Sequence, residues 1–149
     1  MVIPYARQSI SKQDINAVVE VLQSDYLTQG PVVPAFEDAV ADLVGAKHAI
    51  AGNSATSMLH VACLALGVTT GDRVWTAPNS FVASANCALY CNAEIDFVDI
   101  DSETFNMSPV VLATKLEEAK KSNTLPKVII PVHMGGQSCD MQSISLLAQ

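Results

Sequence analysis

The chain has 149 residues, enough for one domain with a substantial core, and half of them are hydrophobic. Eight lysines and arginines stand against 15 aspartates and glutamates, and this acidic balance, with no basic cluster, disfavours nucleic acid and anionic membrane surfaces as partners. With no apolar run of bilayer length, no signal-peptide core and no CxxC pair among its four cysteines, the sequence predicts a cytoplasmic protein with reduced thiols.

Helices and strands alternate along most of the chain. A first helix is expected from Ser11, with Asp14 in the reciprocal capping position, and "LTQGPVVP" separates it from a short helix over 36–44 that Gly45 ends. The predicted elements that follow are strand "HAIAG", helix 54–66, strand "RVWTAP", helix 80–91, strand "EIDFVDID", helix 109–121, strand "KVIIPVHM" and a helix opening near Met141. This succession predicts a three-layer α/β/α sandwich with a mostly parallel sheet.

The last predicted helix, "QSISLLAQ", stops in mid-pattern without a glycine, a proline or a polar tail. No repeat, linker or low-complexity tract divides the chain. We therefore expect this sequence to be a piece of a longer protein, whose catalytic groups need not all lie within it.

A break in "AIAGNSATSMLHVACLALG" is the first candidate binding feature. Small and hydroxylated residues stand where a helix begins, and the first N–H groups of a helix bind anions well. An ordinary capped turn is the simpler interpretation of these residues alone. The spacing excludes a P-loop, since Ser57 and Met58 stand where a second glycine and the lysine would be needed, and it also lacks the second glycine of a dinucleotide fingerprint.

Two further loops follow predicted strands and are expected at the same edge of the sheet. Phe81 lies just after "RVWTAP", where its ring could stack on a flat ligand or simply cover the sheet. His133 and Gln137 surround a Gly-Gly pair after the last strand, and His133 could equally be a satisfied histidine at a strand end.

The acidic run "EIDFVDIDSET" does not fit a calcium loop, because Thr104 and Val110 stand where glycine and glutamate would be required. Asp99 and Asp101 are expected instead to end the strand and cap the next turn. No G-x-S-x-G elbow is present. Metal and serine-hydrolase chemistry are therefore not expected.

The string from "GNSATSMLHVACLALG" through "APNSFVASAN" and "EIDFVDID" to "PVHMGGQSCDM" resembles the first half of the large domain of the DegT/DnrJ/EryC1/StrS sugar aminotransferases. The segments "IPYARQSI" and "YLTQGPVVPAFE" are similar to that family's N-terminal segment. The resemblance covers nearly the whole chain. It implies a pyridoxal 5′-phosphate (PLP) transferase of fold type I, with an N-terminal segment and helix over 1–30 and an incomplete PLP-binding domain over 31–149.

Position by position, the resemblance implies that N–H groups and the Thr56 hydroxyl hold the cofactor phosphate and that Phe81 stacks on the pyridine ring. The implied cofactor-binding residues are Ser54, Ala55, Thr56 and Phe81. The implied substrate-binding residues, near a nucleotide-sugar site at the interface of a homodimer, are Tyr5, Thr28, Gly30 and His133.

The family's Schiff-base lysine and the carboxylate for the pyridine nitrogen are expected after Gln149, so the chain alone is expected to be inactive. The implied reaction transfers an amino group from L-glutamate to a nucleotide-linked 4-keto-6-deoxy sugar, and "NSATS" is most similar to the enzymes of pseudaminic acid synthesis. A sugar dehydratase or a 3-keto-sugar aminotransferase on the same scaffold, or a non-catalytic α/β binding module, remain as alternatives.

Overall fold

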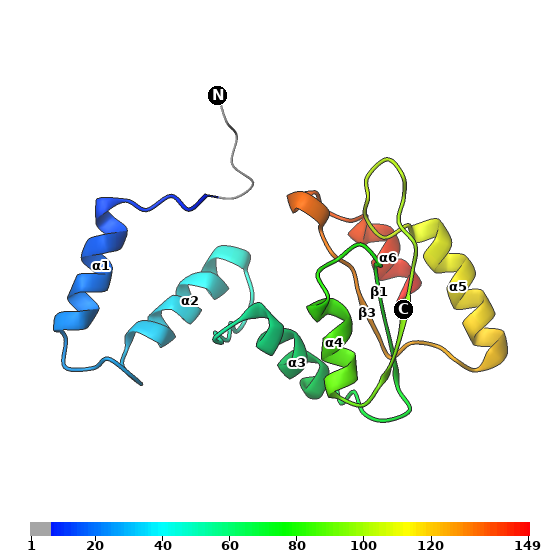
Figure 1. Cartoon of the computed structure of the whole chain (residues 1–149), viewed down its shortest axis with the longest axis horizontal. Coiled ribbons are helices and arrows are strands. Elements are labelled where there is room, and N and C mark those ends of the chain that lie inside the picture. Colours follow the sequence, from blue (N-terminus) through cyan, green and yellow to red (C-terminus); the bar gives the residue numbers. More distant parts are fainter. Residues whose placement is uncertain (1–6) are drawn as a thin grey trace. The chain divides into compact units, whose positions relative to one another are not determined.

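A computed structural model describes residues 7–149, so the expected substrate residue Tyr5 lies outside the described part of the chain. The chain forms two compact units, one ending at Ala51 and the other spanning Gly52–Gln149 (Figure 1). Within residues 7–149, no helix combines the length and the apolar character needed to cross a membrane.

The first unit contains two helices, α1 (Lys12–Gln23) and α2 (Val32–Val44). The predicted capping box is confirmed, since the Ser11 N–H donates to Asp14 Oδ2 over 2.7 Å and the Asp14 N–H donates to Ser11 Oγ over 3.2 Å. Helix α2 ends at Gly45 as predicted but begins earlier than expected. Pro34 falls in its first turn, where a missing N–H costs no helical hydrogen bond.

The predicted strand "HAIAG" was wrong, because residues 46–54 contain no strand. The Ala51 N–H donates to the Glu37 carboxylate over 2.7 Å, so a side chain of α2 takes a backbone group that a strand would use in its ladder. A strand exists only where another strand pairs with it, and sequence composition does not report on that partner.

The second unit is built on a parallel sheet of β1 (Arg73–Thr76), β2 (Glu94–Phe97) and β3 (Val128–Ile130) in the order β2-β1-β3. The register pairs Trp75 with Asp96 on one side and with Ile129 on the other. The helices of this unit are α3 (Ala55–Ala65), α4 (Ala83–Tyr90), α5 (Pro109–Ser122) and α6 (Met141–Leu147), with a short 3-10 turn, η1, at Met134–Gly136.

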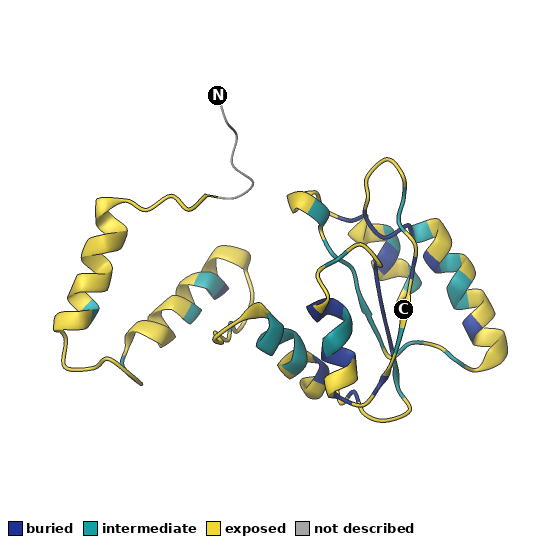
Figure 2. Ribbon diagram, in the orientation of Figure 1, coloured by how far each residue is buried: buried dark blue, intermediate teal, exposed yellow. Residues whose placement is uncertain are grey.

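Strand β1 separates two apolar cores because successive side chains of a strand point to opposite faces. Val74 belongs to a cluster with residues of α3 and α4, including Cys63 and Cys87. Trp75 belongs to a second cluster with Leu112 of α5 and residues near α6. Figure 2 shows the buried residues concentrated on β1 and on the helix faces turned toward it. A parallel sheet with an apolar core on each face agrees with the predicted fold class.

All three strands end earlier than predicted, and β1 ends at Thr76 rather than at Pro78. After β2, the Asp99 carboxylate accepts from the Ile100 N–H over 2.8 Å, which removes that group from ladder pairing. After β3, Pro131 has no N–H to offer. Asp101 caps the next turn as expected, and hydrogen bonds from Thr104 and Glu103 lower its pKa.

Candidate functional site

The predicted phosphate turn starts helix α3. Ser54 is the N-cap residue, and its hydroxyl accepts from the Ser57 N–H over 3.2 Å while its carbonyl accepts from Met58 over 3.1 Å. Within the described chain, this leaves the first two N–H groups of the helix, those of Ala55 and Thr56, without a partner. Free N–H groups at the positive end of a helix dipole fit a phosphate or a carboxylate.

A close approach of side chain and backbone shapes the same turn. A Cβ at Gly52 would meet the side chain of Met58, so glycine is the residue that this packing admits without a shift. Ala55 is exposed and Thr56 is half-buried. The turn is therefore open to solvent at the Ala55 N–H and more enclosed at the Thr56 hydroxyl.

Phe81 lies in the loop between β1 and α4, where its side chain is 75% exposed. Its carbonyl accepts from the Ser84 N–H over 3.0 Å, which fixes the backbone at the start of α4. An aromatic ring held on a fixed backbone but not buried has its faces available for stacking. The alternative in which Phe81 covers the sheet does not fit this exposure.

The described residues show no hydrogen bond between Phe81 and the Ser54–Thr56 turn. The two are connected through their helices, because α3 and α4 pack against each other across the core that contains Cys63 and Cys87. The structure thus places both features at the starts of neighbouring helices.

His133 follows β3 and is exposed. Its Nδ1 accepts from the Cys139 N–H over 3.0 Å, so the imidazole is tied into the loop at residues 131–140. In the neutral ring the proton then lies on Nε2, which is the nitrogen left for a ligand. The predicted alternative, a histidine with its hydrogen bonds satisfied within the protein, therefore holds for Nδ1 of His133 but not for Nε2.

Two asparagines that the sequence analysis missed hold these loops together. Asn79 donates to the Phe105 carbonyl over 2.9 Å, which joins the loop that carries Phe81 to the loop after β2. Asn106 is buried and joins that second loop to the loop that carries His133, through Met134, Gln137 and Ser138. The one local sequence signal of such a role is that Asn106 stands between two apolar residues in "FNMS", where a buried amide needs hydrogen-bond partners.

Thr28 and Gly30 lie in the first unit, where the structure does not relate them to the loops of the second unit. Gln29 between them has a left-handed φ of 54°, and a Cβ at Gly30 would meet the Tyr26 Cβ at 2.7 Å. The "LTQG" turn thus has a defined shape of its own that excludes larger residues at Gly30.

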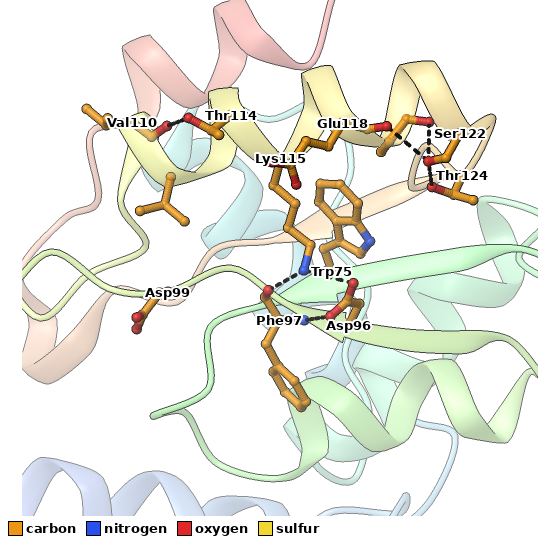
Figure 3. A pocket seen from close by; sticks show the side chains of 12 residues that line it. Trp75, Asp96, Phe97, Asp99, Val110, Thr114, Lys115, Glu118, Ser122 and Thr124 are labelled. Atoms are coloured by element: carbon orange, nitrogen blue, oxygen red, sulfur yellow. Dashed lines mark hydrogen bonds and ion pairs between the residues drawn. The ribbon is translucent and has the colours of Figure 1, made fainter.

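A hollow of about 570 Å³ lies apart from these loops, between β2 and α5 (Figure 3). Lys115 reaches across it, with Nζ 2.8 Å from Asp96 Oδ2, 2.7 Å from the Phe97 carbonyl and 5.0 Å from the centre of the Trp75 ring. Burial raises the pKa of Asp96, but hydrogen bonds from Lys115 and the Phe97 N–H and the nearby positive charges outweigh it, and the pKa is lowered overall. These contacts leave Lys115 half-buried.

The other three lysines of the second unit lie away from the carboxyl ends of the strands. Lys120 and Lys121 are in the last turn of α5. Lys127 precedes β3 and pairs with Asp72 over 2.9 Å. Hydrogen bonds from Lys127 and the Thr69 N–H lower the pKa of Asp72. The Lys127 ammonium thus supports the fold, since it also donates to the Gly67 carbonyl over 2.6 Å.

Comparison with protein families matches residues 8–149 to the DegT/DnrJ/EryC1/StrS aminotransferase family. The spore coat polysaccharide biosynthesis protein SpsC of Bacillus subtilis is 45% identical over 147 residues, which are 99% of this chain and 36% of that protein. The putative pyridoxal phosphate-dependent aminotransferase EpsN of the same organism is 40% identical over 136 residues, 91% of this chain and 35% of that protein.

Solved structures agree with this match. Helicobacter pylori PseC, an aminotransferase of pseudaminic acid biosynthesis, superposes with a TM-score of 0.87 at 32% identity and covers 97% of this chain and 38% of that one. The PLP-form of the putative sugar aminotransferase Spr1654 from Streptococcus pneumoniae superposes with a TM-score of 0.84 at 27% identity, over 97% of this chain and 36% of that one. The chain thus spans little more than a third of the length of these relatives.

Proposed function

Because the chain belongs to the DegT/DnrJ/EryC1/StrS aminotransferase family, we propose that it forms part of a pyridoxal phosphate-dependent enzyme that transfers an amino group from L-glutamate to a nucleotide-linked keto-sugar. The observation that carries the proposal is the start of α3, where two N–H groups are free beside a threonine hydroxyl. Solved relatives in PLP and PMP forms support pyridoxal phosphate as the cofactor.

In this proposal, the free N–H groups of Ala55 and Thr56 and the Thr56 hydroxyl bind the cofactor phosphate, with Ser54 shaping the turn. Phe81 offers a ring face to the pyridine ring. When bound, pyridoxal phosphate serves as the electron sink for the amino transfer. The chain's own contribution is to bind and orient that group, while the lysine and the carboxylate of the reaction come from the rest of the protein.

The substrate side of the proposal assigns His133 as a hydrogen-bond donor through Nε2 and the "LTQG" turn, with Thr28 and Gly30, as a second contact. Tyr5 is proposed for the same side from its place in the sequence. We further propose a cytoplasmic homodimer in which the nucleotide-sugar site lies at the subunit interface.

The likeness to PseC supports a 4-keto-6-deoxy sugar of the pseudaminic acid type as the substrate. The relatives SpsC and EpsN leave the sugar itself open, because their names give no substrate. A 3-keto-sugar aminotransferase and a sugar dehydratase remain alternatives on the same scaffold.

The test is an assay of the complete protein with pyridoxal phosphate, ¹⁵N-labelled L-glutamate and, in parallel reactions, a UDP-linked 4-keto-6-deoxy-N-acetylhexosamine and its 3-keto counterpart. We expect ¹⁵N in the sugar product and stoichiometric 2-oxoglutarate. Nuclear magnetic resonance of the product distinguishes amination at C4 from amination at C3. Loss of water without incorporation of ¹⁵N would identify the dehydratase, and no turnover with 3-keto or 4-keto substrates would favour the binding module.

A further inference from the structure

The side chain of Asn106 makes all of its hydrogen bonds to one loop. It is 3% exposed, its Nδ2 donates to the carbonyls of Gln137 over 3.0 Å and Ser138 over 3.1 Å, and its Oδ1 accepts from the Met134 N–H over 2.9 Å. Since a buried amide is costly to leave unsatisfied, three such bonds to one segment fix both partners.

The segment that Asn106 holds contains the η1 turn, in which the Gly136 N–H donates to the His133 carbonyl over 3.2 Å and the Gln137 N–H to the Met134 carbonyl over 3.0 Å. Between the contact points lie Gly135 and Gly136, both in the left-handed region with φ of 61° and 87°, and a Cβ at either would meet nothing within 4 Å. Glycine is therefore needed here for the backbone conformation and not for close packing. A Gly-Gly pair also loses more conformational entropy on ordering than other residues do, so this turn depends on further hydrogen bonds. The Asn106 amide adds three hydrogen bonds from outside this segment.

The braced loop sets the state of His133. His133 Nδ1 accepts from the Cys139 N–H. Both residues are sequence neighbours of Asn106 partners, since His133 directly precedes Met134 and Cys139 directly follows Ser138. Asn106 thus holds the backbone on both sides of the His133–Cys139 hydrogen bond. With Nδ1 occupied as an acceptor, the neutral ring offers Nε2–H as its remaining polar group.

We propose that Asn106 is a positioning residue, which keeps the 133–139 loop closed so that His133 presents Nε2–H to an acceptor oxygen of the nucleotide-linked sugar. The proposal deepens the proposed function and rests on it for the identity of the ligand. Asn106 itself touches neither the cofactor turn nor Phe81 in the described structure.

The sharpest variant is Asn106→Asp in the complete protein. It keeps an acceptor for the Met134 N–H but faces two carbonyl oxygens with a carboxylate, which raises the pKa of the new side chain until protonation restores one donor. At pH 8 we expect KM for the sugar nucleotide to rise by about tenfold, with cofactor affinity unchanged within about twofold.

As the pH falls, the Asn106→Asp variant should approach wild-type KM, with the wild type measured at each pH as the reference. Asn106→Ala should show the same rise in KM without recovery at low pH. Asn123→Gly, which keeps the left-handed C-cap of α5, is the matched control and should behave as wild type. A KM that is unchanged in Asn106→Asp, or that is raised equally at every pH, would overturn the proposal.

A second measurement does not depend on activity. The ¹⁵N shifts of the His133 ring in the complete protein should show Nδ1 unprotonated in the wild type and a mixture of tautomers in Asn106→Asp at pH 8. An unchanged tautomer in that variant refutes the role of Asn106 even if no sugar substrate is turned over. Absence of turnover by the wild type with a normal His133 response instead removes only the proposed function.

Discussion

Lys115 and Asp96 form an ion pair, with Nζ 2.8 Å from Oδ2, that closes the outer edge of β2 (Figure 3). The Asp96 carboxylate accepts from the Phe97 N–H, and Lys115 donates to the Phe97 carbonyl. The backbone groups of alternate residues of β2 bond β1, and Phe97 lies between two such residues. The Phe97 N–H and carbonyl therefore point to the side of β2 opposite β1. Side chains thus occupy backbone groups that would otherwise pair with another strand.

Replacing Lys115 with Met should therefore promote association of the complete protein. The methionine keeps a stem over the Trp75 ring but frees the Phe97 carbonyl. Because both members of the pair are partly exposed, the free energy of unfolding should fall by less than about 1 kcal/mol. Sedimentation velocity over a concentration series should show more association than for Lys120→Met, a control in the same helix. Equal behaviour of the two variants would count against edge protection.

Thr56→Val should weaken cofactor binding by the complete protein. The substitution removes a hydroxyl donor to a dianionic phosphate, and a charge-assisted hydrogen bond contributes roughly 1.5–3 kcal/mol. We expect the affinity for pyridoxal phosphate to fall by about one to two decades, measured by dialysis and absorbance. Thr114→Val, on α5, removes a hydroxyl bonded to the Val110 carbonyl and should retain the cofactor. Full retention by Thr56→Val would show that the phosphate binds elsewhere.

Phe81→Ala should affect binding without affecting folding. The ring is mostly exposed, so its loss should change the free energy of unfolding by no more than about 0.5 kcal/mol. An aromatic stacking contact is worth roughly 0.5–1.5 kcal/mol, so cofactor affinity should fall by roughly two- to tenfold. Phe97→Ala at the β2 edge serves as the control for an exposed ring. A lower melting temperature with unchanged affinity would mean that Phe81 is a structural residue.

The buried thiols should resist alkylation. All four cysteines are free and buried, and burial, with the hydrogen bond and charge of Cys87, raises the pKa of Cys63 to about 11. At pH 8, iodoacetamide should label Cys63 slowly in the folded protein and rapidly in guanidinium, as read by peptide mass spectrometry. Rapid labelling of the folded protein would contradict the packing of α3 on α4.

The same shift makes stability depend on alkaline pH. A thiol whose folded pKa is raised contributes fully below the unfolded value of about 8.5, and the contribution disappears as the pH rises toward 11. The free energy of unfolding should therefore decline over this window. Cys63→Ala should reduce the slope, which identifies the Cys63 thiol as its source.

Local patterns predicted the elements of the second unit well. Ser108 caps α5 with Pro109 in its first turn. The predicted strands "RVWTAP", "EIDFVDID" and "KVIIPVHM" contain β1, β2 and β3. The segment "HAIAG" shows the limit of this reasoning, because a strand depends on a partner that is distant in sequence. Asn106 shows another limit, since its bonds join residues 28 to 32 positions apart and no spacing rule marks them.

Phe81 and His133 were predicted to follow strands of the sheet, and in the structure they follow β1 and β3. What the sequence did not reveal is how these loops are held. A short polar side chain such as Asn79 has no periodic pattern, and its purpose emerges only when the distant carbonyl of Phe105 is placed beside it.

The loop at residues 101–107 is fastened on both sides, by Asn79 to the Phe105 carbonyl and by the Asn106 amide to the loop after β3. Although Phe105 is exposed, this double fastening makes the loop a poor place for a protease to cut, because a protease must first draw out an extended stretch of backbone. It also makes the loop intolerant of changes in length. One residue inserted between Phe105 and Asn106 would uncouple the two asparagines, and with them the Phe81 and His133 loops.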